Sequence, residues 1–595
     1  MKGDGRGAGS GIWIALGLVS IGVHLWLIFS GLIPNLVTRP LHMALALPWV
    51  FIYLAKSRAG LMSGAVLAAT GVACCLWVAV NETVLGDQYG YLEGRVQLWI
   101  AGALVLIVLE MARRAIGWPL PVIAALALAY GLFGQHLSGE FGHPGLPLGS
   151  FLGTITIAEG GLWGSLTGVS VSIIAVFVIM GAVLNAGEAG QGFMNLASAA
   201  AGNLRGGAAK VSVLSSALFG SISGSASANV ASTGAITLPA MRELGYPKRL
   251  AAAVEAVASS GGQIMPPLMG AGAFVMVELT GIPYTSIMAA ALLPAILFFV
   301  TVWVGIDAYA ARYALQPLPE DKMPAGRIVL ITGAFFLVPF AVLLERMFRG
   351  GYTPQYAAAC AILAGVVLLA FDATLRPSVS RFIARMQRAA LAAGEQIAVI
   401  ASIILCASLI ISVLGQTGLG VKITSLILSA GGERLWPALL LTALACLLLG
   451  MEVPTTAAYV ICISVAGPAL QKLGVEPLTA HLFVFWFALL STITPPVCGA
   501  VFIAAGMIGE DWLKVAFTAM ALGVGLYLIP LAMVANPAVI DLAQRPVAAG
   551  MTAMQIGLGL VCVSRGLIAP GGVIVRIIWA VAGVSILFIP QFVLR

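Results

Sequence analysis

Long apolar runs recur along the chain and are separated by short segments that carry most of its charged residues. Most runs are about 20 residues long, which is the length that a helix needs to cross the hydrocarbon core of a bilayer. Their hydrophobicity is continuous and does not alternate, so it predicts helices and excludes a transmembrane β-barrel. The pattern therefore predicts an all-α polytopic membrane protein. The runs occupy residues 12–33, 61–80, 98–112, 119–137, 169–187, 284–306, 327–345, 355–371, 396–414, 514–535 and 573–593.

Composition and charge agree with this prediction. Hydrophobic residues fill 60% of the 595 positions, charged residues fill 9%, and the mean hydropathy is +1.04. A soluble protein could not bury that much apolar surface. The net charge of +7 does not indicate a nucleic-acid partner, because the basic residues lie in short loops, where they orient helices. Segments 81–94 and 136–160 carry acids and almost no bases, so we expect them to face outward.

The chain contains an internal repeat. PAMRELGYP at 239–247 matches PALQKLGVE at 468–476, and IMPPLMGA at 264–271 matches ITPPVCGA at 493–500. Both matches pair residues at the same offset along the chain, so one alignment without a gap contains them both. Proline and glycine recur at helix breaks in general, but chance explains poorly why both matches keep one register. We therefore predict two structurally related halves.

Each copy has the same plan, in which two short apolar runs flank a polar turn and a helix interrupted by two prolines follows. The turn is GSISGSASANVASTG (220–234) in the first copy and MEVPTTAAY (451–459) in the second. Half-length helices are tolerated at membrane depth only where protein or a water-filled cavity supplies hydrogen-bond partners. We therefore predict re-entrant hairpins and broken helices. The hairpins span about 208–241 and 435–471, and the broken helices span about 248–280 and 478–508.

The charges around the two hairpins differ. Basic residues flank the first hairpin, which should therefore enter from the cytoplasm, whereas the second hairpin has a nearly neutral set of neighbours. This difference predicts that the two copies are inverted. Inverted repeats with discontinuous helices near the bilayer midplane are typical of secondary transporters.

Discontinuous helices bring two kinds of partial charge to one place. Helix N-termini offer unpaired N–H groups to anions, whereas unwound carbonyls can bind a hard cation such as Na⁺. Proline cannot donate a backbone hydrogen bond, so the breaks SSGGQIMPP (259–267) and LSTITPP (490–496) free carbonyl groups. Hydroxyl and amide oxygens at the hairpin tips could complete a cation site. Small polar residues also favour close helix packing, which is an equal alternative for any single serine here.

Three acidic residues, Glu255, Glu278 and Glu452, lie in apolar surroundings. An ionised acid at the bilayer centre costs roughly 2.5–3.5 kcal/mol, so such residues usually have a function or a partner. Glu452 lies in the second polar turn, where it could help to bind a cation or carry a proton. Glu278 is explained more simply by a place at the outer interface.

Other function classes lack support in the sequence. The chain has no GxxxxGK[ST] nucleotide-binding loop, no nucleophile–base pair and no metal-ligand spacing. Its cysteines lie mostly in apolar segments and are expected to be buried small hydrophobes. We therefore expect neither an enzyme nor a cofactor other than a coupling ion.

Three stretches carry a resemblance to a known family: FGSISGSASANVASTGAITLPAMRELGYPKRLAAAVEAVASSGGQIMPP, GMEVPTTAAYV and TITPPVCGAVF. All three resemble the large permease subunit of tripartite ATP-independent periplasmic (TRAP) transporters. The resemblance is most specific over 170–310 and 395–535. The helices at about 12–137 take the place of the small permease subunit, fused here to the large one. The form SISGSASANVASTG is similar to the TAXI-type branch of the family.

The resemblance implies the elevator-type fold of the ion-transporter superfamily, in which a mobile domain carries the hairpins and broken helices against a scaffold. It also implies a multi-pass protein of the bacterial cytoplasmic (inner) membrane. The implied domains are small-subunit-like scaffold helices at 1–165, the first half of the large-subunit core at 166–325, connecting scaffold helices at 326–395, the second half of the core at 396–535, and a C-terminal extension with a terminal helix at 536–595.

The function that the resemblance implies is the import of a small organic anion, most simply a carboxylate. A separate periplasmic substrate-binding protein of TAXI type delivers the anion, and a Na⁺ or H⁺ gradient drives the symport. An ion-coupled carboxylate transporter that needs no binding protein is an alternative. An intramembrane enzyme using Glu255 or Glu452 is a third interpretation, which no nucleophile–base pair supports.

The resemblance also implies specific site residues. The first cation site would use Ser223, Ser225 and Asn229 with the carbonyls of Gly262, Ile264 and Pro266. The second would use Gly450, Thr455 and Thr456 with the carbonyls of Ser491, Ile493 and Pro495. The substrate would lie between the two tips, near Ser227, Gln263, Thr492 and Thr494. Glu255 and Glu452 depart from the family pattern, and as candidate proton carriers they leave the choice between Na⁺ and H⁺ open.

Overall fold

The computed structural model describes residues 10–432, 434–451 and 453–589, which form helices and no β-strand. Eleven helical segments of this part of the chain are long and apolar enough to cross a membrane. The prediction of an all-α polytopic membrane protein is therefore confirmed.

The set of long helices differs from the predicted set at four positions. Asn35–Tyr53 and Pro546–Ile568 are additional candidate spans. Asn35–Tyr53 escaped detection because Arg39 and His42 lower its hydropathy. The predicted runs 355–371 and 573–593 instead form helices of only 15 and 16 residues, α17 and α27.

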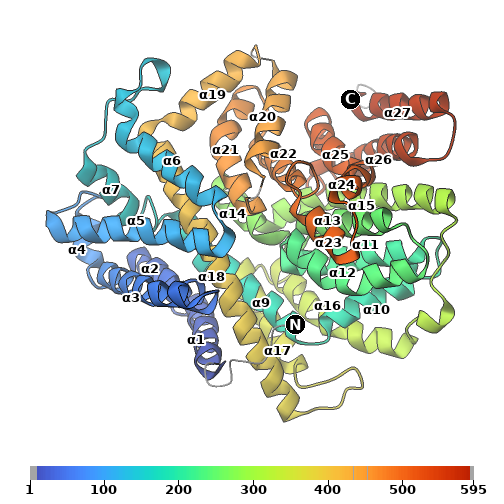
Figure 1. The fold of residues 1–595 in the computed structure, drawn as a ribbon, viewed down its shortest axis with the longest axis horizontal. Helices are drawn as coiled ribbons and strands as arrows, with labels where there is room; N and C mark the ends of the chain where they lie inside the picture. The colour runs from blue at the N-terminus through green and yellow to red at the C-terminus, as the bar shows by residue number, and fades with distance from the viewer. Residues whose placement is uncertain (1–9, 433, 452, 590–595) are drawn as a thin grey trace.

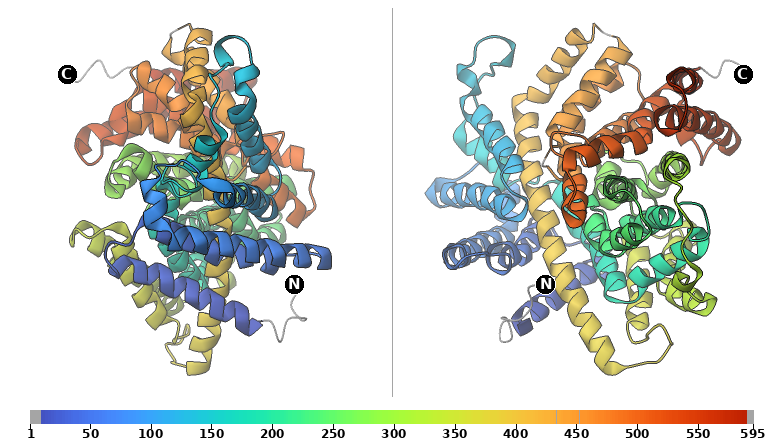
Figure 2. Two further views of the ribbon diagram at one scale, coloured as in Figure 1. Left: turned by 90° about the vertical axis from the view of Figure 1, so that its left-hand side faces the viewer. Right: turned by 45° about the vertical axis from the view of Figure 1, so that its right-hand side comes forward.

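The N-terminal helices pack on one side of a single long helix, α18 (Val379–Thr417). Helices α1, α2, α5 and α6 all contact α18. In Figures 1 and 2 these blue helices lie on one side of α18, and most later helices lie on the other. The bounds are α1 Ser10–Phe29, α2 Asn35–Pro48, η1 Trp49–Tyr53, α3 Arg58–Val80, α4 Glu82–Asp87, α5 Gly94–Ile116, α6 Pro119–Phe133, η2 Gly134–His136, η3 Gly139–Phe141 and α7 Leu148–Thr156.

Helix α18 is longer than its apolar pattern suggested. Its 39 residues correspond to about 60 Å, twice the thickness of the hydrocarbon core. The helix starts well before the predicted run 396–414 because Ser378 caps its first turn and no proline interrupts it. Arg385 in this extra part is buried and pairs with the carboxylate of Glu188. The boundary drawn between 395 and 396 lies inside this helix.

The remaining helices form two series, one before α18 and one after it. The first series is α8 Ser165–Val169, η4 Ser170–Ile174, α9 Ala175–Ala186, α10 Ala189–Ala201, α11 Gly207–Ser223, α12 Ala226–Glu243, α13 Lys248–Gly261, η5 Gly262–Ile264, α14 Gly270–Thr280, α15 Tyr284–Tyr313, η6 Glu320–Lys322, α16 Gly326–Phe348 and α17 Pro354–Leu368. The second is α19 Leu419–Ala430, α20 Leu435–Leu449, α21 Thr455–Lys472, α22 Pro477–Leu490, α23 Gly499–Ile508, α24 Trp512–Leu522, α25 Val524–Ala535, η7 Pro537–Ile540, α26 Pro546–Ile568 and α27 Val573–Phe588.

The two series contain helices that begin and end in one register. The alignment that pairs Pro239 with Pro468 also pairs the first and last residues of α12 with those of α21. In the same alignment the first and last residues of α13 pair with those of α22. Helices α14 and α23 also begin at corresponding positions. Each of the two intervening breaks contains a cis proline pair, Pro266–Pro267 and Pro495–Pro496. The repeat seen in the sequence thus extends to the helix boundaries.

Local chemistry explains why the helices turn where they do. Gly224 ends α11 in a left-handed conformation (φ 62°), which glycine adopts without steric cost. Ser225 then caps α12, and its Oγ accepts a hydrogen bond from the backbone N–H of Ala228. In the second series Pro454 precedes α21 with a φ of −55°, a value that its ring fixes.

Candidate functional site

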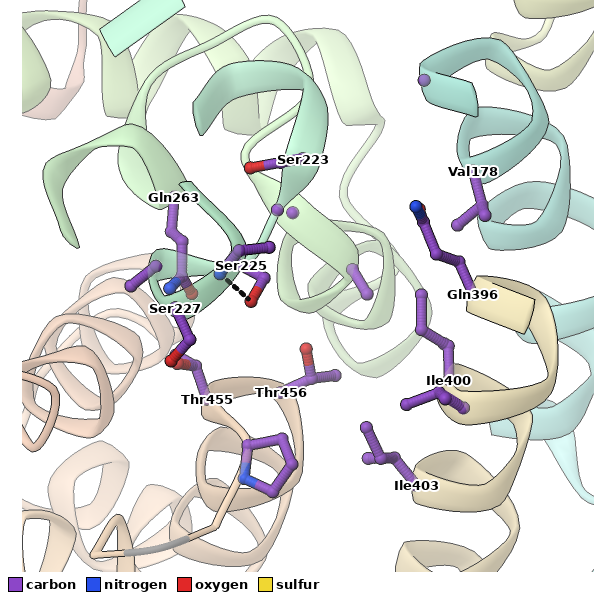
Figure 3. A pocket seen from close by; sticks show the side chains of 18 of the residues that line it. Val178, Ser223, Ser225, Ser227, Gln263, Gln396, Ile400, Ile403, Thr455 and Thr456 are labelled. Atoms are coloured by element: carbon purple, nitrogen blue, oxygen red, sulfur yellow. Dashed lines mark hydrogen bonds between the residues drawn. The ribbon is translucent and has the colours of Figure 1, made fainter. Parts of the chain in front are cut away.

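A cavity of about 1040 Å³ lies where the two polar turns, the two helix breaks and helices α9 and α18 meet. Figure 3 shows Ser225, Ser227 and Thr455 on one side of it, with Ile400 and Ile403 of α18 on the opposite side. The turn between α11 and α12 and the turn between α20 and α21 therefore contribute to one site, although they are far apart in the sequence.

Four helices have their N-terminal residues in the wall of this cavity. Helices α12 and α21 contribute Ala226 and Thr455, and helices α14 and α23 contribute Gly270 and Gly499. The first N–H groups of a helix have no partner within the helix, and its N-terminus carries about half a positive charge. Both properties make such ends binding sites for anions. The repeat therefore brings the backbone N–H groups of four helix ends to one cavity.

The wall of the cavity has few charged side chains. Among the described residues that line the cavity, Glu395 of α18 is the only charged one. The polar groups of the two turns and breaks are hydroxyls and amides. The wall opposite them mixes apolar side chains such as Val178, Ile400 and Ile403 with the polar Asn185, Glu395 and Gln396. An anion in this cavity would thus meet backbone N–H groups and hydroxyls rather than lysine or arginine.

Half of the predicted site residues line this cavity. Ser223 has a buried Oγ that finds no hydrogen-bond partner among the described residues. Thr492 lines the wall and shares a hydrogen bond of 2.8 Å with Ser260, which joins the two helix breaks. The predicted residues that line the cavity are Ser223, Ser225, Ser227, Gln263, Gly450, Thr455, Thr456, Ser491 and Thr492.

Other predicted residues do not line the cavity. Thr494 turns away from it and bonds to the carbonyl of Leu490 and to the hydroxyl of Tyr527, each at 2.7 Å. Ile264 and Ile493 are fully buried. The predicted residues outside the lining are Asn229, Glu255, Gly262, Ile264, Pro266, Ile493, Thr494 and Pro495.

Asn229 ties three helices together. Its Nδ2 donates to the carbonyl of Ser216 on α11 at 2.9 Å and to that of Ser259 on α13 at 3.4 Å. Its own backbone carbonyl accepts a hydrogen bond of 2.8 Å from the hydroxyl of Thr233. The side chain is fully buried at a point where the backbones of α11 and η5 touch. Asn229 therefore holds the first hairpin against the first break.

Glu255 of α13 lies beside these groups and is fully buried. Its carboxylate accepts hydrogen bonds from Ser212 at 2.7 Å and from Ser259 at 3.2 Å. Thr237 of α12 also donates to it, and the hydroxyl of Thr233 lies within hydrogen-bond distance of both this carboxylate and the carbonyl of Asn229, so its one proton can serve either acceptor. Three helices thus direct hydroxyl groups at one carboxylate.

The other two acids have different outcomes. Glu278 is exposed near the end of α14. Glu452 lies outside the described residues. The described part of the chain contains no cluster of histidine, cysteine, aspartate or glutamate that could hold a metal ion.

Sequence reasoning missed two groups of residues. The first is the face of α18 that lines the cavity, where Gln396, Ile400 and Ile403 follow helical spacing. The second is the set of hydroxyls around Glu255. Its signal was present, because serines or threonines spaced four apart at 212 and 216 and at 233 and 237 share one helix face.

Comparison with known proteins identifies the family. A family model described as "Tripartite ATP-independent periplasmic transporter, DctM component" matches residues 103–547. The chain is 26% identical over 340 residues to the C4-dicarboxylate TRAP transporter large permease protein DctM of Pseudomonas aeruginosa, a match that covers 56% of this chain and 77% of that protein. It is 25% identical over 364 residues to the isethionate TRAP transporter permease protein DctMQ of Oleidesulfovibrio alaskensis, covering 60% and 55%.

A third relative is the 2,3-diketo-L-gulonate TRAP transporter large permease protein YiaN of Escherichia coli, 24% identical over 342 residues, covering 57% of this chain and 78% of that protein. The resemblance to the large permease family is thereby confirmed. Because the family model spans most of the sequence, this chain belongs to the DctM family of TRAP transporter large permeases and is a multi-pass protein of the inner membrane.

Proposed function

We propose that this chain is a secondary active transporter that imports a small organic anion, which binds in the cavity between the two polar turns. The observation that carries the proposal is the convergence of four helix N-termini on that cavity. Together with the hydroxyls of Ser227, Thr455 and Thr456, their N–H groups form a site for an oxyanion. These N–H groups can bind a carboxylate without fixing a full positive charge in the membrane.

The proposed substrate is a carboxylate, delivered by a periplasmic substrate-binding protein of TAXI type. The names of the relatives support this class, since they refer to C4-dicarboxylates and 2,3-diketo-L-gulonate, and a third refers to the sulfonate isethionate. The form of the first polar turn supports the TAXI-type assignment. A transporter that works without a binding protein is the alternative that the experiment below separates.

The proposed driving force is a Na⁺ or H⁺ gradient. The Oγ of Ser223, which has no hydrogen-bond partner among the described residues, and the end of α13 at the first break support a cation site beside the first turn. Thr455 and Thr456 support a second one beside the other turn. Cations at these positions would sit next to the anion, so each would strengthen the binding of the other.

The proposed mechanism is an elevator, in which the hairpins and broken helices move together against α18. The position of the cavity supports it: the hairpins and breaks line one side, and α18 lines the other with Val399, Ile400 and Ile403 beside Glu395 and Gln396. We also propose that residues 1–165 serve as a fused small permease subunit. The family match begins only at residue 103, and the helices before it pack on α18.

The test is uptake by the purified chain in proteoliposomes. Labelled succinate, 2-oxoglutarate and pyruvate are offered with and without a purified TAXI-type solute-binding protein from the same organism, under separate Na⁺ and pH gradients. We expect uptake of at least one carboxylate that requires both the binding protein and a gradient. Uptake without the binding protein supports the alternative, and no uptake under any condition contradicts the proposal.

A matched pair of variants tests the cavity. Thr456→Val removes a hydroxyl from the wall. Thr518→Val removes one from α24, where it bonds to the carbonyl of Lys514 and to no other group of the described residues. A hydrogen bond to a charged ligand is worth about 1.5–3 kcal/mol, so Thr456→Val should weaken apparent substrate affinity about tenfold or more. Equal affinities for the two variants would exclude Thr456 from the binding site.

A further inference from the structure

A buried carboxylate without a cationic partner among the described residues lies between the first hairpin and the first broken helix. Glu255 has no solvent exposure, and the hydrogen bonds to its two oxygens come from hydroxyls of α11, α12 and α13. An ionised carboxylate is costly at such a place unless it is paired or well hydrogen-bonded. Here neutral hydroxyls take the role that a lysine or arginine usually has.

The ion pairs of the described residues do not include Glu255. Helices α11, α12, α15, α23 and α24 pack against α13. Helix α23 presents no titratable group, and Tyr309 and Tyr313 of α15 stack on each other. The charged groups of the other helices are directed elsewhere: Lys210 pairs with Asp307 at 2.6 Å, and Arg242, Glu243, Lys248, Arg249, Arg312 and Lys514 are exposed.

The second copy of the repeat does not contain this arrangement. In the register of the repeat, Glu255 corresponds to Val484, and the hydroxyls of Thr233, Thr237 and Ser259 correspond to Cys462, Ala466 and Ala488. Helices α21 and α22 nevertheless have the same lengths and register as α12 and α13. The hairpin architecture can therefore be built without a carboxylate, so Glu255 requires an explanation other than the fold.

The hydroxyls connect Glu255 to the cavity. Thr233 contacts both the carboxylate of Glu255 and the backbone carbonyl of Asn229, and Asn229 holds the first hairpin against the first break. Ser232, the neighbour of Thr233, lines the cavity. A change in the charge of Glu255 would thus alter the hydrogen bonds that fix the first polar turn.

We propose that Glu255 binds and releases the proton that couples to transport; this inference rests on the proposed transport function. When Glu255 is ionised, the surrounding hydroxyls donate to it. When a proton from periplasmic water binds, the new carboxylic O–H donates to a hydroxyl lone pair, and the hydroxyls rotate, since each both donates and accepts. The proton leaves to cytoplasmic water in the inward-facing state, so one proton enters the cell per cycle at this site.

The same oxygens do not suit an alkali cation. The hydroxyls point their hydrogens at the carboxylate, at 2.7 Å for Ser212, whereas an alkali cation would need oxygen lone pairs at this place. Proton binding needs no such set of lone pairs. Ser, Thr and Glu side chains in direct hydrogen-bond contact therefore favour a proton over Na⁺ at this position.

The test compares Glu255→Gln with Glu278→Gln in proteoliposomes that hold a pH-sensitive dye. Glutamine keeps the size of the side chain and resembles the protonated acid, with one acceptor oxygen and an N–H donor, but it cannot exchange a proton. Glu278 is an exposed acid on α14. We expect Glu255→Gln to lose pH-driven accumulation and internal acidification while it still exchanges labelled carboxylate across the membrane. Glu278→Gln should behave like wild type in all three measurements.

Several outcomes would overturn the inference alone. Wild-type uptake driven by Na⁺ without acidification, or normal acidification by Glu255→Gln, refutes the role of Glu255 but leaves the transport function intact. Absence of all uptake and exchange in wild type refutes the transport function itself.

A second variant covers the case in which Glu255→Gln does not fold. Thr237→Val removes one donor that favours the ionised carboxylate, so the pH of half-maximal uptake should rise. A purely structural role for Glu255 would lower the amount of folded protein without moving that pH, and an unmoved pH would overturn the inference.

Discussion

The contact between the first hairpin and the first break depends on two glycines that leave no space for side chains. A Cβ atom on Gly220 would lie 2.4 Å from the Cα of Gly262 and 2.7 Å from Nδ2 of Asn229. Ordinary van der Waals contact begins at 3.4 Å, so Gly220→Ala would have to separate the two backbones by about 1 Å. The neighbouring atom is backbone and cannot move away as a flexible side chain could.

The energetic effect has two parts of opposite sign. Overpacking of this kind costs about 1–3 kcal/mol, whereas alanine in a helix is favoured over glycine by about 1 kcal/mol. We therefore expect Gly220→Ala to lower the free energy of unfolding by up to about 2 kcal/mol. The separation would also break the hydrogen bond between Asn229 and the carbonyl of Ser259, which is already 3.4 Å long.

The assay is the melting temperature in detergent, followed with a thiol-reactive dye, since most of the free cysteines are buried. The matched control is Gly102→Ala in α5, where a new Cβ meets no atom within 4 Å. Gly220→Ala should melt below both wild type and Gly102→Ala, and its transport should fall. A melting temperature of Gly220→Ala equal to that of Gly102→Ala would refute the reasoning.

Two further predictions concern regions away from the cavity. Ser170→Ala removes the hydroxyl that lies 3.0 Å from Nε2 of the buried His42, and this ring nitrogen then has no partner, which should cost about 1–3 kcal/mol of stability. The control Ser172→Ala, on the exposed side of the same helix, should leave the melting temperature unchanged. Outside the membrane-spanning segments, hydrogen bonds from the side chain and backbone of Thr374 and the backbone of Arg376 lower the pKa of Asp372. The stabilisation is therefore present above the usual aspartate pKa of about 3.9 and is lost as the pH falls below it. The difference in melting temperature between wild type and Asp372→Asn should thus be constant near neutral pH and shrink in acid. A difference that does not change in acid would contradict this role.

The sequence was informative wherever a structural feature has a local cause. Glycine and serine at 224 and 225 form the turn and cap that end one helix and begin the next, and paired prolines mark both breaks. These signals placed the polar turns correctly and, with the repeat, predicted that both would take part in one site. The helix boundaries at constant offset follow from the same local signals.

The remaining features depend on contacts between distant segments. Asn229 is in the first polar turn, like Ser225, yet it faces carbonyls of α11 and α13 because those helices pack on that side of α12. Thr494 follows the second break but bonds to Tyr527, and Gln396 lines the cavity only because α18 crosses both turns. A local sequence pattern indicates that a residue is polar and lies near a break. Its hydrogen-bond partner depends on how distant helices pack around it.

The absence of lysine and arginine from the described cavity wall has an electrical consequence for the proposed transport cycle. The partial charges of helix ends stay with the protein and return with it, so they do no net electrical work over a full cycle. A bound anion, however, leaves its charge on the inside, and moving one negative charge against an inside-negative potential of 100 mV takes about 2.3 kcal/mol. Each anionic charge therefore needs one accompanying cation for electroneutral import, and a further cation allows the membrane potential itself to drive accumulation.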